Sequence, residues 1–211
     1  MKITSLLLIP ALASLNFAAP LSQTSSSSPL GLRGTDSSST SLACSDPGTA
    51  IPFLRGYSSS ATDHFYTTNA LEMENAVANL GYASEGDAAL IFGTQDPTSV
   101  TIPLYRIYRS ADTDHFYTTD ANERANTIAG GGTDEGIAGY VYSSSVCPGL
   151  VPFYRAFSPS ADDHFYTTNL AERNTAITSL GYVDEGVAAY VLLVPGKDLG
   201  PISLVNQGLQ V

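Results

Sequence analysis

The stretch DHFYTT at residues 63–68 decides how this chain is organised, because the same six letters return at 114–119 and 163–168. The residues around it recur as well. Matching segments occupy residues 51–92, 102–142 and 151–193 of the 211-residue chain, and we call them units 1, 2 and 3. A repeat of about fifty residues is typical of a protein built from copies of one structural element. All three histidines of the sequence fall at the same position of the repeat.

Each unit is predicted to contain two strands, a short helix and one or two further strands. A proline near the start of the unit suits the first position of a strand, and HFYTT is rich in aromatic and β-branched residues. Asn69 and Glu72, like their equivalents at 120 and 123 and at 169 and 172, form a capping-box pattern in which the glutamate reaches back to the cap. We expect the first helix to bury Val77 and Leu80 and to end at Gly81.

The units are too small to bury their apolar faces alone, so we expect them to share one core. The predicted fold is mainly β with short helices, arranged as a three-unit, pseudo-threefold β-trefoil-like barrel. An open solenoid is the alternative, but it needs more units and polar caps. Unit 2 has Gly130, Gly131 and Gly132 where unit 1 reads Leu-Gly-Tyr. We therefore expect its helix end, and any pocket beside it, to differ.

The segments outside the units complete the domain organisation. Residues 1–19 combine Lys2, an apolar run and small residues, as in a secretory signal peptide; a membrane-spanning helix would need about 20 apolar residues. Residues 20–43 are rich in serine and predict a disordered leader, with an O-glycosylated stalk or a propeptide cleaved near Arg33 as alternatives. The three-repeat domain is placed at 44–195 and a C-terminal tail at 196–211. The protein is expected to be secreted and extracellular.

The cysteines and the charge narrow the class further. In an exported chain, Cys44 and Cys147 are expected to form a disulfide, which would support closure because each cysteine precedes a unit. Nine Lys and Arg residues against twenty Asp and Glu residues give a net charge of −11. Such a chain repels phosphate backbones and anionic membrane surfaces, so we expect no nucleic-acid partner. No stretch after the signal peptide is apolar enough for a membrane span, so we expect none.

The Asp-His pairs at 63–64, 114–115 and 163–164 suggest catalysis, because a carboxylate can orient an imidazole as a general base. Neighbouring residues of a strand point to opposite faces, however, so the two side chains of a pair are not expected to meet. The sequence contains no G-x-S-x-G nucleophile elbow. A motif present three times also suits binding better than one asymmetric catalytic site. We therefore expect no enzyme and no catalytic residue.

The residue types in the repeat allow two kinds of metal site. In the first, the three histidines coordinate one zinc ion. In the second, each unit binds its own calcium ion through Asp and Glu carboxylates. Because the sequence has no ligand-dense loop of the EF-hand kind, we expect no metal ligand and no cofactor. A structural role is predicted for Glu85, Glu135 and Glu185, which are expected to form partly buried pairs with Arg55, Arg106 and Arg155.

Carbohydrate recognition is the predicted function. Sugar sites stack an aromatic ring on the apolar face of the sugar and bind its hydroxyls with Asp, Asn, Arg and His. Several weak sites on one rigid body raise avidity for a polymer such as a cell-wall polysaccharide. The candidate ligand-binding residues are Arg55, Tyr57, Asp63, His64 and Tyr66 in unit 1, Arg106, Tyr108, Asp114, His115 and Tyr117 in unit 2, and Arg155, Asp163, His164 and Tyr166 in unit 3. In unit 3, Phe157 replaces the hydroxylated ring.

Other functions remain open at this point. The Arg, His and Tyr positions also fit a purely structural role. A secreted inhibitor or effector that binds a protein through residues 93–100 or 143–150 is the alternative function, and an accessory of a metal-dependent hydrolase is a third.

With PLYR at 103–106, DHFYTT in every unit and EGIAGYV at 135–141, the chain resembles a secreted tandem-repeat family of fungi and bacteria of unknown function. The resemblance extends from Ile51 to Leu193. It implies an accessory or binding module of exported proteins, some of which accompany hydrolase domains. We expect no hydrolase domain in this chain.

Overall fold

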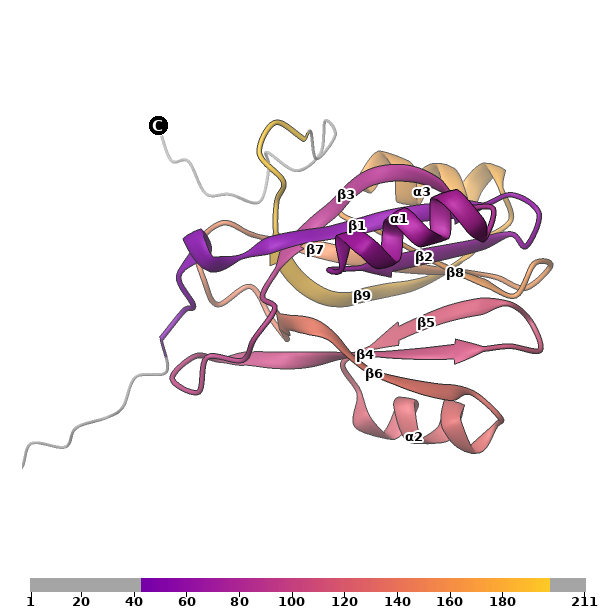
Figure 1. Ribbon diagram of the computed structural model, residues 1–211. Coiled ribbons are helices and arrows are strands. Elements are labelled where there is room, and N and C mark those ends of the chain that lie inside the picture. Colours follow the sequence, from indigo (N-terminus) through magenta and orange to yellow (C-terminus); the bar gives the residue numbers. More distant parts are fainter. Residues whose placement is uncertain (1–42, 198–211) are drawn as a thin grey trace, which may run out of the picture. The chain divides into compact units, whose positions relative to one another are not determined.

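The structure is a computed structural model that describes residues 43–197 (Figure 1). The signal peptide predicted for 1–19, the leader predicted for 20–43 except its last residue, and the tail predicted for 196–211 except its first two residues lie outside the described residues. Within residues 43–197, no helix combines the length and the hydropathy needed to cross a membrane.

The three units contain the same elements in the same order. Unit 1 contains β1 (Ile51–Ser58), β2 (Asp63–Thr67), α1 (Ala70–Asn79) and β3 (Ala83–Ile91). Unit 2 contains β4 (Thr101–Arg109), β5 (Asp114–Thr118), α2 (Ala121–Ala129) and β6 (Thr133–Tyr142). Unit 3 contains β7 (Leu150–Ser158), β8 (Asp163–Thr167), α3 (Leu170–Ser179) and β9 (Val183–Leu192). A 3-10 turn, η1 (Pro47–Thr49), precedes unit 1.

The first strand of each unit lies between the other two and pairs with both of them in antiparallel fashion. Backbone pairing between units is reduced to single residue pairs, which are Leu90 with Leu192, Tyr142 with Tyr190 and Phe92 with Tyr140. The prediction of a mainly β protein with short helices is confirmed. The β-trefoil-like barrel is not confirmed, because the described strands do not close into a barrel. Each unit keeps its strand pairing largely to itself and meets its neighbours through side chains.

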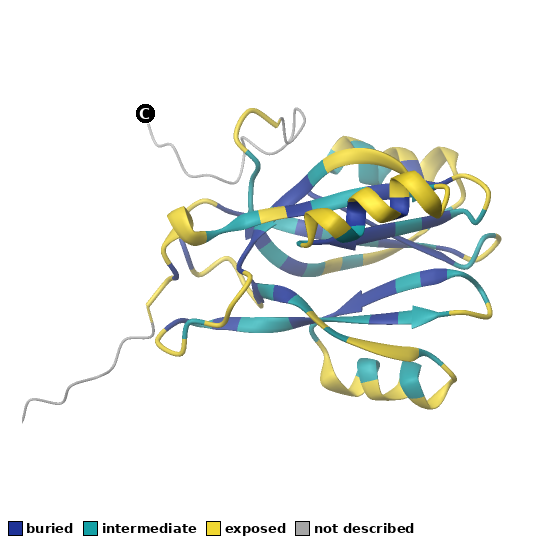
Figure 2. Ribbon diagram, in the orientation of Figure 1, coloured by how far each residue is buried: buried dark blue, intermediate teal, exposed yellow. Residues whose placement is uncertain are grey.

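All three units contribute to one hydrophobic core. Phe53, Leu104 and Phe153 occupy the same position of their units and are completely buried in the same cluster. The cluster also contains residues from the third strands, among them Ile91, Val141 and Val191. The expectation that the units share an interior is therefore met. Figure 2 shows exposed residues on the helices, on the loops and along part of the third strands, whose first residues are exposed.

The centre of this core holds a closed ring of three tyrosines, Tyr66, Tyr117 and Tyr166. The hydroxyl of Tyr117 accepts the backbone N–H of Tyr66 at 2.8 Å and donates to its carbonyl at 2.6 Å. Tyr166 bonds Tyr117 in the same way, and Tyr66 bonds Tyr166. Each hydroxyl thus satisfies two buried backbone groups that would otherwise be costly.

Every helix begins with the predicted cap. The side chain of Asn69, Asp120 or Asn169 accepts hydrogen bonds from two amides of the first helical turn. The expectation that the glutamate reaches back to the cap amide is wrong. In unit 1, Thr67 Oγ1 accepts the backbone N–H of Asn69 and donates to Glu72 at 2.5 Å. The carboxylate of Glu72 is instead bound by Arg106 of unit 2.

The buried face of α1 also differs from the prediction. Met73 and Ala76 are buried, whereas Val77 and Leu80 are exposed. Leu80 is the C-cap residue and therefore lies beyond the face that packs on the strands. Gly81 follows it with a positive φ of 80°, so the helix ends where the sequence indicated.

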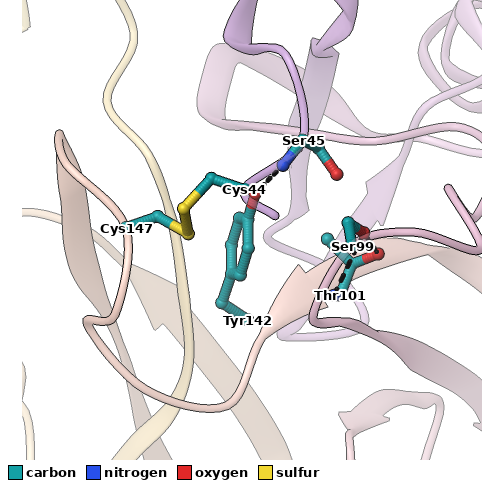
Figure 3. Close-up of a disulfide and its surroundings, with 6 residues drawn as sticks. All are labelled: Cys44, Ser45, Ser99, Thr101, Tyr142 and Cys147. Atoms are coloured by element: carbon teal, nitrogen blue, oxygen red, sulfur yellow. Dashed lines mark hydrogen bonds between the residues drawn. A yellow bond between two sulfur atoms is a disulfide. The ribbon is translucent and has the colours of Figure 1, made fainter. Parts of the chain in front are cut away.

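The predicted disulfide between Cys44 and Cys147 is present (Figure 3). It joins the segment before unit 1 to the segment before unit 3. Beside it, the N–H of Ser45 donates to the hydroxyl of Tyr142, which ends unit 2. The segment before unit 1 is therefore held by a disulfide and a hydrogen bond to residues 103 and 97 positions later in the sequence.

Candidate functional site

The histidines and aspartates of DHFYTT do pair, but always between different units. His64 Nδ1 lies 2.7 Å from Asp163 Oδ2, His115 Nδ1 2.7 Å from Asp63 Oδ2, and His164 Nδ1 2.8 Å from Asp114 Oδ2. The other oxygen of each aspartate accepts the backbone N–H of the same histidine. The two side chains of one Asp-His pair do not meet, as expected for neighbours on a strand, and the partner of each histidine comes from another unit, which strand geometry alone does not predict.

The three aspartates have no exposed surface. Besides its histidine, Asp63 accepts the hydroxyl of Tyr82, and Asp163 accepts that of Tyr182. Asp114 lies 3.4 Å from Nη1 of Arg109. The prediction that Asp63, Asp114 and Asp163 bind a ligand directly is wrong, because their oxygens are inside the protein and already hold a neighbouring unit in place.

Tyr66, Tyr117 and Tyr166 require the same correction. They are completely buried in the tyrosine ring, so no sugar can stack on them. The three-histidine zinc site is not formed either. Within residues 43–197, one group of three His, Cys, Asp or Glu side chains has ligand atoms within 4.8 Å of one another. It consists of Asp63, Asp114 and Asp163 and contains no histidine.

The predicted Arg-Glu pairs are present within each unit. The Nε atoms of Arg55, Arg106 and Arg155 lie 2.7, 2.9 and 2.7 Å from Glu85, Glu135 and Glu185. The structure adds a second glutamate from another unit. Arg55 binds Glu172 with both terminal nitrogens, at 3.1 and 2.9 Å. Arg106 binds Glu72 and Arg155 binds Glu123 in the same bidentate way.

These second glutamates are the glutamates of the capping-box pattern, Glu72, Glu123 and Glu172. The sequence therefore predicted that they lie in the first turn of a helix, but it did not predict which arginine each of them binds. Burial by itself raises the pKa of Glu72, but hydrogen bonds from Arg106 and Thr67 outweigh it and leave the pKa below its ordinary value. Glu123 and Glu172 show the same balance with their own arginines. All three therefore stay ionised at neutral pH.

These contacts frame three grooves, each between two units. Groove A lies between units 3 and 1, groove B between units 1 and 2, and groove C between units 2 and 3. Their volumes are about 310, 450 and 420 Å³. In each groove, one unit supplies a phenylalanine and the helix-start glutamate, and the other supplies the histidine and the third-strand glutamate.

Equivalent residues line the grooves. Groove A contains Phe165, Glu172, Leu180, Tyr182, His64 and Glu85. Groove B contains Phe65, Glu72, Leu80, Tyr82, His115 and Glu135. Groove C contains Phe116, Glu123, Gly130, Arg109, His164 and Glu185.

Groove C departs from the other two, as expected for the glycine-altered unit. It lacks the tyrosine and the leucine because Gly132 and Gly130 stand in their places. Ile107 takes up the space of the missing ring, and a Cβ atom on Gly132 would lie 2.7 Å from Ile107 Cγ2. Arg109 supplies the third donor to the aspartate in place of the tyrosine hydroxyl.

The remaining candidates lie beside the grooves. The rings of Tyr57, Tyr108 and Phe157 pack on the three histidines, with centroids 4.5 to 4.7 Å apart. Of these, Tyr108 lines groove B. Burial raises the pKa of Tyr82 and Tyr182, and the adjacent aspartates raise it further, so both remain neutral donors. These tyrosines were not predicted, although the Gly-Tyr pair after the helix occurs in units 1 and 3.

Comparison with known proteins supplies a family but no function. A family model described as "Domain of unknown function (DUF5648)" matches residues 52–192, which include parts of all three units. No curated protein and no solved structure matches the chain. Since the family model covers well over half of the sequence, the chain belongs to the DUF5648 family, a domain of unknown function.

Proposed function

We propose that this protein is a secreted, non-catalytic module that binds carbohydrate at more than one site, in grooves A and B. The observation that carries the proposal is the pair of equivalent grooves, each of which combines an apolar wall with fixed polar groups. Their volumes, about 310 and 450 Å³, fall at the lower end of the range for small-molecule sites, as a short stretch of sugar requires.

The composition of the walls suits a sugar. In groove A, the ring of Tyr182 and the exposed side chain of Leu180 offer an apolar surface to the C–H face of a sugar ring. Glu85 and His64 supply groups that can bind hydroxyls. The buried Asp163 holds His64 through Nδ1, so the ring is oriented before a ligand arrives.

The absence of turnover is also part of the proposal. A histidine held by a buried aspartate is the arrangement of a general base, but glycoside hydrolysis additionally needs a carboxylic acid whose pKa is raised. In these grooves, Glu72 and Glu172 have a lowered pKa and bind arginine. That charge state supports binding better than proton transfer.

Secretion and a pseudo-threefold arrangement belong to the same proposal. The disulfide supports an oxidising compartment. The cyclic order of the tyrosine, His-Asp and Arg-Glu contacts supports the symmetry. Two like grooves on one rigid body would raise avidity for a polymer without any additional contact.

Glycan-array binding of the full chain tests the proposal, followed by titration of the best oligosaccharide. Leu80 and Leu180 are 60% and 64% exposed, so Leu80→Ala and Leu180→Ala should leave the fold intact. We expect the double variant to weaken binding about fivefold through lost apolar contact. Leu71→Ala is the matched control, since Leu71 is 73% exposed outside the grooves. Binding of a purified protein partner through residues 93–100 or 143–150, with no saccharide bound, would replace this proposal with the inhibitor or effector.

A further inference from the structure

We propose that the sugar bound in grooves A and B carries a free, protonated amino group, so that the ligand is a deacetylated amino-sugar polymer. This inference rests on the proposed function and names its substrate class. It also assigns two sites to the chain, because groove C lacks the features that select such a ligand.

The wall of groove A carries an excess of negative charge. Arg55 lies between two glutamates, Glu172 and Glu85, and can neutralise only one of them. His64 is already paired with the buried Asp163. One carboxylate charge in the wall is therefore unbalanced. Groove B repeats this arrangement with Arg106, Glu72 and Glu135.

Groove A also presents a free carboxylate oxygen, on Glu85. Glu85 meets Arg55 through Oε2, and among the described residues its Oε1 has no partner. A third of the Glu85 side chain is exposed, and the residue lines the groove. An ammonium group has three donors and a full charge, whereas a hydroxyl or an acetamide brings no charge to offset that of Glu85.

The same charges argue against acidic sugars. A uronate or a sulfated sugar would bring a further negative group next to Glu85 and Glu172, and like charges at close range repel. The net charge of −11 on the chain adds repulsion at longer distance.

Groove C lacks the apolar half of such a site, because Gly130 replaces the leucine and Gly132 the tyrosine. The lining contains Arg109 instead, whose guanidinium pairs with Asp112 and lies 3.4 Å from Asp114. A guanidinium in this position offers no apolar surface to a sugar ring. Glu185 therefore occupies the position of Glu85 without the same surroundings.

The test is a calorimetric titration of the full chain with two oligomers of equal length, a glucosamine trimer and its N-acetylated form, at a pH where the amine is protonated. We expect two sites per chain and about tenfold tighter binding of the free amine, the size of one charge-assisted hydrogen bond. Glu85→Gln and Glu135→Gln should each abolish the tenfold preference at one site. Glu185→Gln is the matched control in groove C and should change neither affinity more than about twofold.

Folding is checked by thermal unfolding of each variant. Arg55 keeps its bidentate bond to Glu172 in Glu85→Gln, so that variant should remain folded. Glu74→Gln, on the exposed side of α1, removes the same charge outside the grooves and should leave the preference intact.

The failures are distinguishable. Equal binding of the two trimers would overturn the amino-sugar inference and leave the carbohydrate proposal standing. If neither trimer nor any other saccharide binds, the proposed function itself falls. Displacement of the glucosamine trimer by tetralysine at equal concentration would mean that the grooves bind any cation, and it would overturn the amino-sugar inference. An effect of Glu185→Gln as large as that of Glu85→Gln would refute the assignment of the sites to grooves A and B.

Discussion

Grooves A and C are built from the same positions of the repeat, yet they share only the contacts between units at their base. We call these Asp-His and Arg-Glu contacts the inner layer, and the side chains at the surface of the groove the outer layer. In both, a buried aspartate holds the histidine of the neighbouring unit and an arginine joins two glutamates. The outer layer differs, because groove A has a tyrosine and a leucine where groove C has two glycines. The contacts between units are therefore separable from the surface that a ligand would meet.

Unit 2 has Gly132 where units 1 and 3 have a tyrosine, and two other residues of unit 2 differ together with it. Ile107 stands where unit 1 has Gly56 and unit 3 has Ala156, and its Cγ2 would lie 2.7 Å from a Cβ atom on Gly132, so a side chain at position 132 has no room. Arg109 restores a donor to Asp114. The aspartate thus keeps its third donor in every unit even though the residue that donates has changed.

The largest effect is expected from removing an inner-layer aspartate. Asp63→Ala leaves the N–H and the ring of His115 and the hydroxyl of Tyr82 without their buried acceptor. We expect a loss of about 4 kcal/mol in the free energy of unfolding, as for a broken buried pair. Urea denaturation measures it, with Glu74→Ala on the exposed side of α1 as the control.

The same substitution in unit 2 tests whether the buried contacts of the grooves are equivalent. Asp114→Ala should cost as much as Asp63→Ala, since Asp114 holds His164 in groove C in the same way that Asp63 holds His115 in groove B. A mild effect of Asp114→Ala alone would mean that the units are not held together in the same way.

A smaller effect should follow from restoring the ring in groove C. Gly132→Tyr crowds Ile107 and should cost about 1–3 kcal/mol, as overpacking usually does. Ile107→Ala reproduces the residue of unit 3, so the double variant should be more stable than the sum of the two single changes predicts. A double-mutant cycle from urea unfolding measures the coupling; strictly additive changes would contradict the compensation.

The smallest effect concerns acid, and it should be the same in all grooves. Glu72, Glu123 and Glu172 have a lowered pKa in the folded state. Their contribution to stability is present above the ordinary glutamate pKa of about 4.3 and is lost as the pH falls through the folded value. Unfolding midpoints between pH 6 and pH 3 should therefore fall less steeply in Glu172→Gln than in the wild type. An unchanged slope in this variant would show that the ion pair with Arg55 does not contribute.

Much of the fold was predictable because it depends on local chemistry. Strand propensity, the caps at Asn69, Asp120 and Asn169, and the cysteine pair were all read from neighbouring residues. The buried face of α1 was predicted wrongly because periodicity does not say how narrow the packing surface is. For the candidate site, the arginine pairs within a unit were found, whereas the residues of the groove walls, such as Tyr182 and Leu180, were not.

The sequence alone determined that three similar units exist, that each is mainly β with one short helix, and that the second differs at its glycines. Only the tertiary structure decided that His64 is held by Asp163 and Arg55 by Glu172, contacts that join residues 99 and 117 positions apart. The reason is physical. Identical side chains in three units make every pairing chemically equal, so the choice among them depends on how the units pack around the shared core.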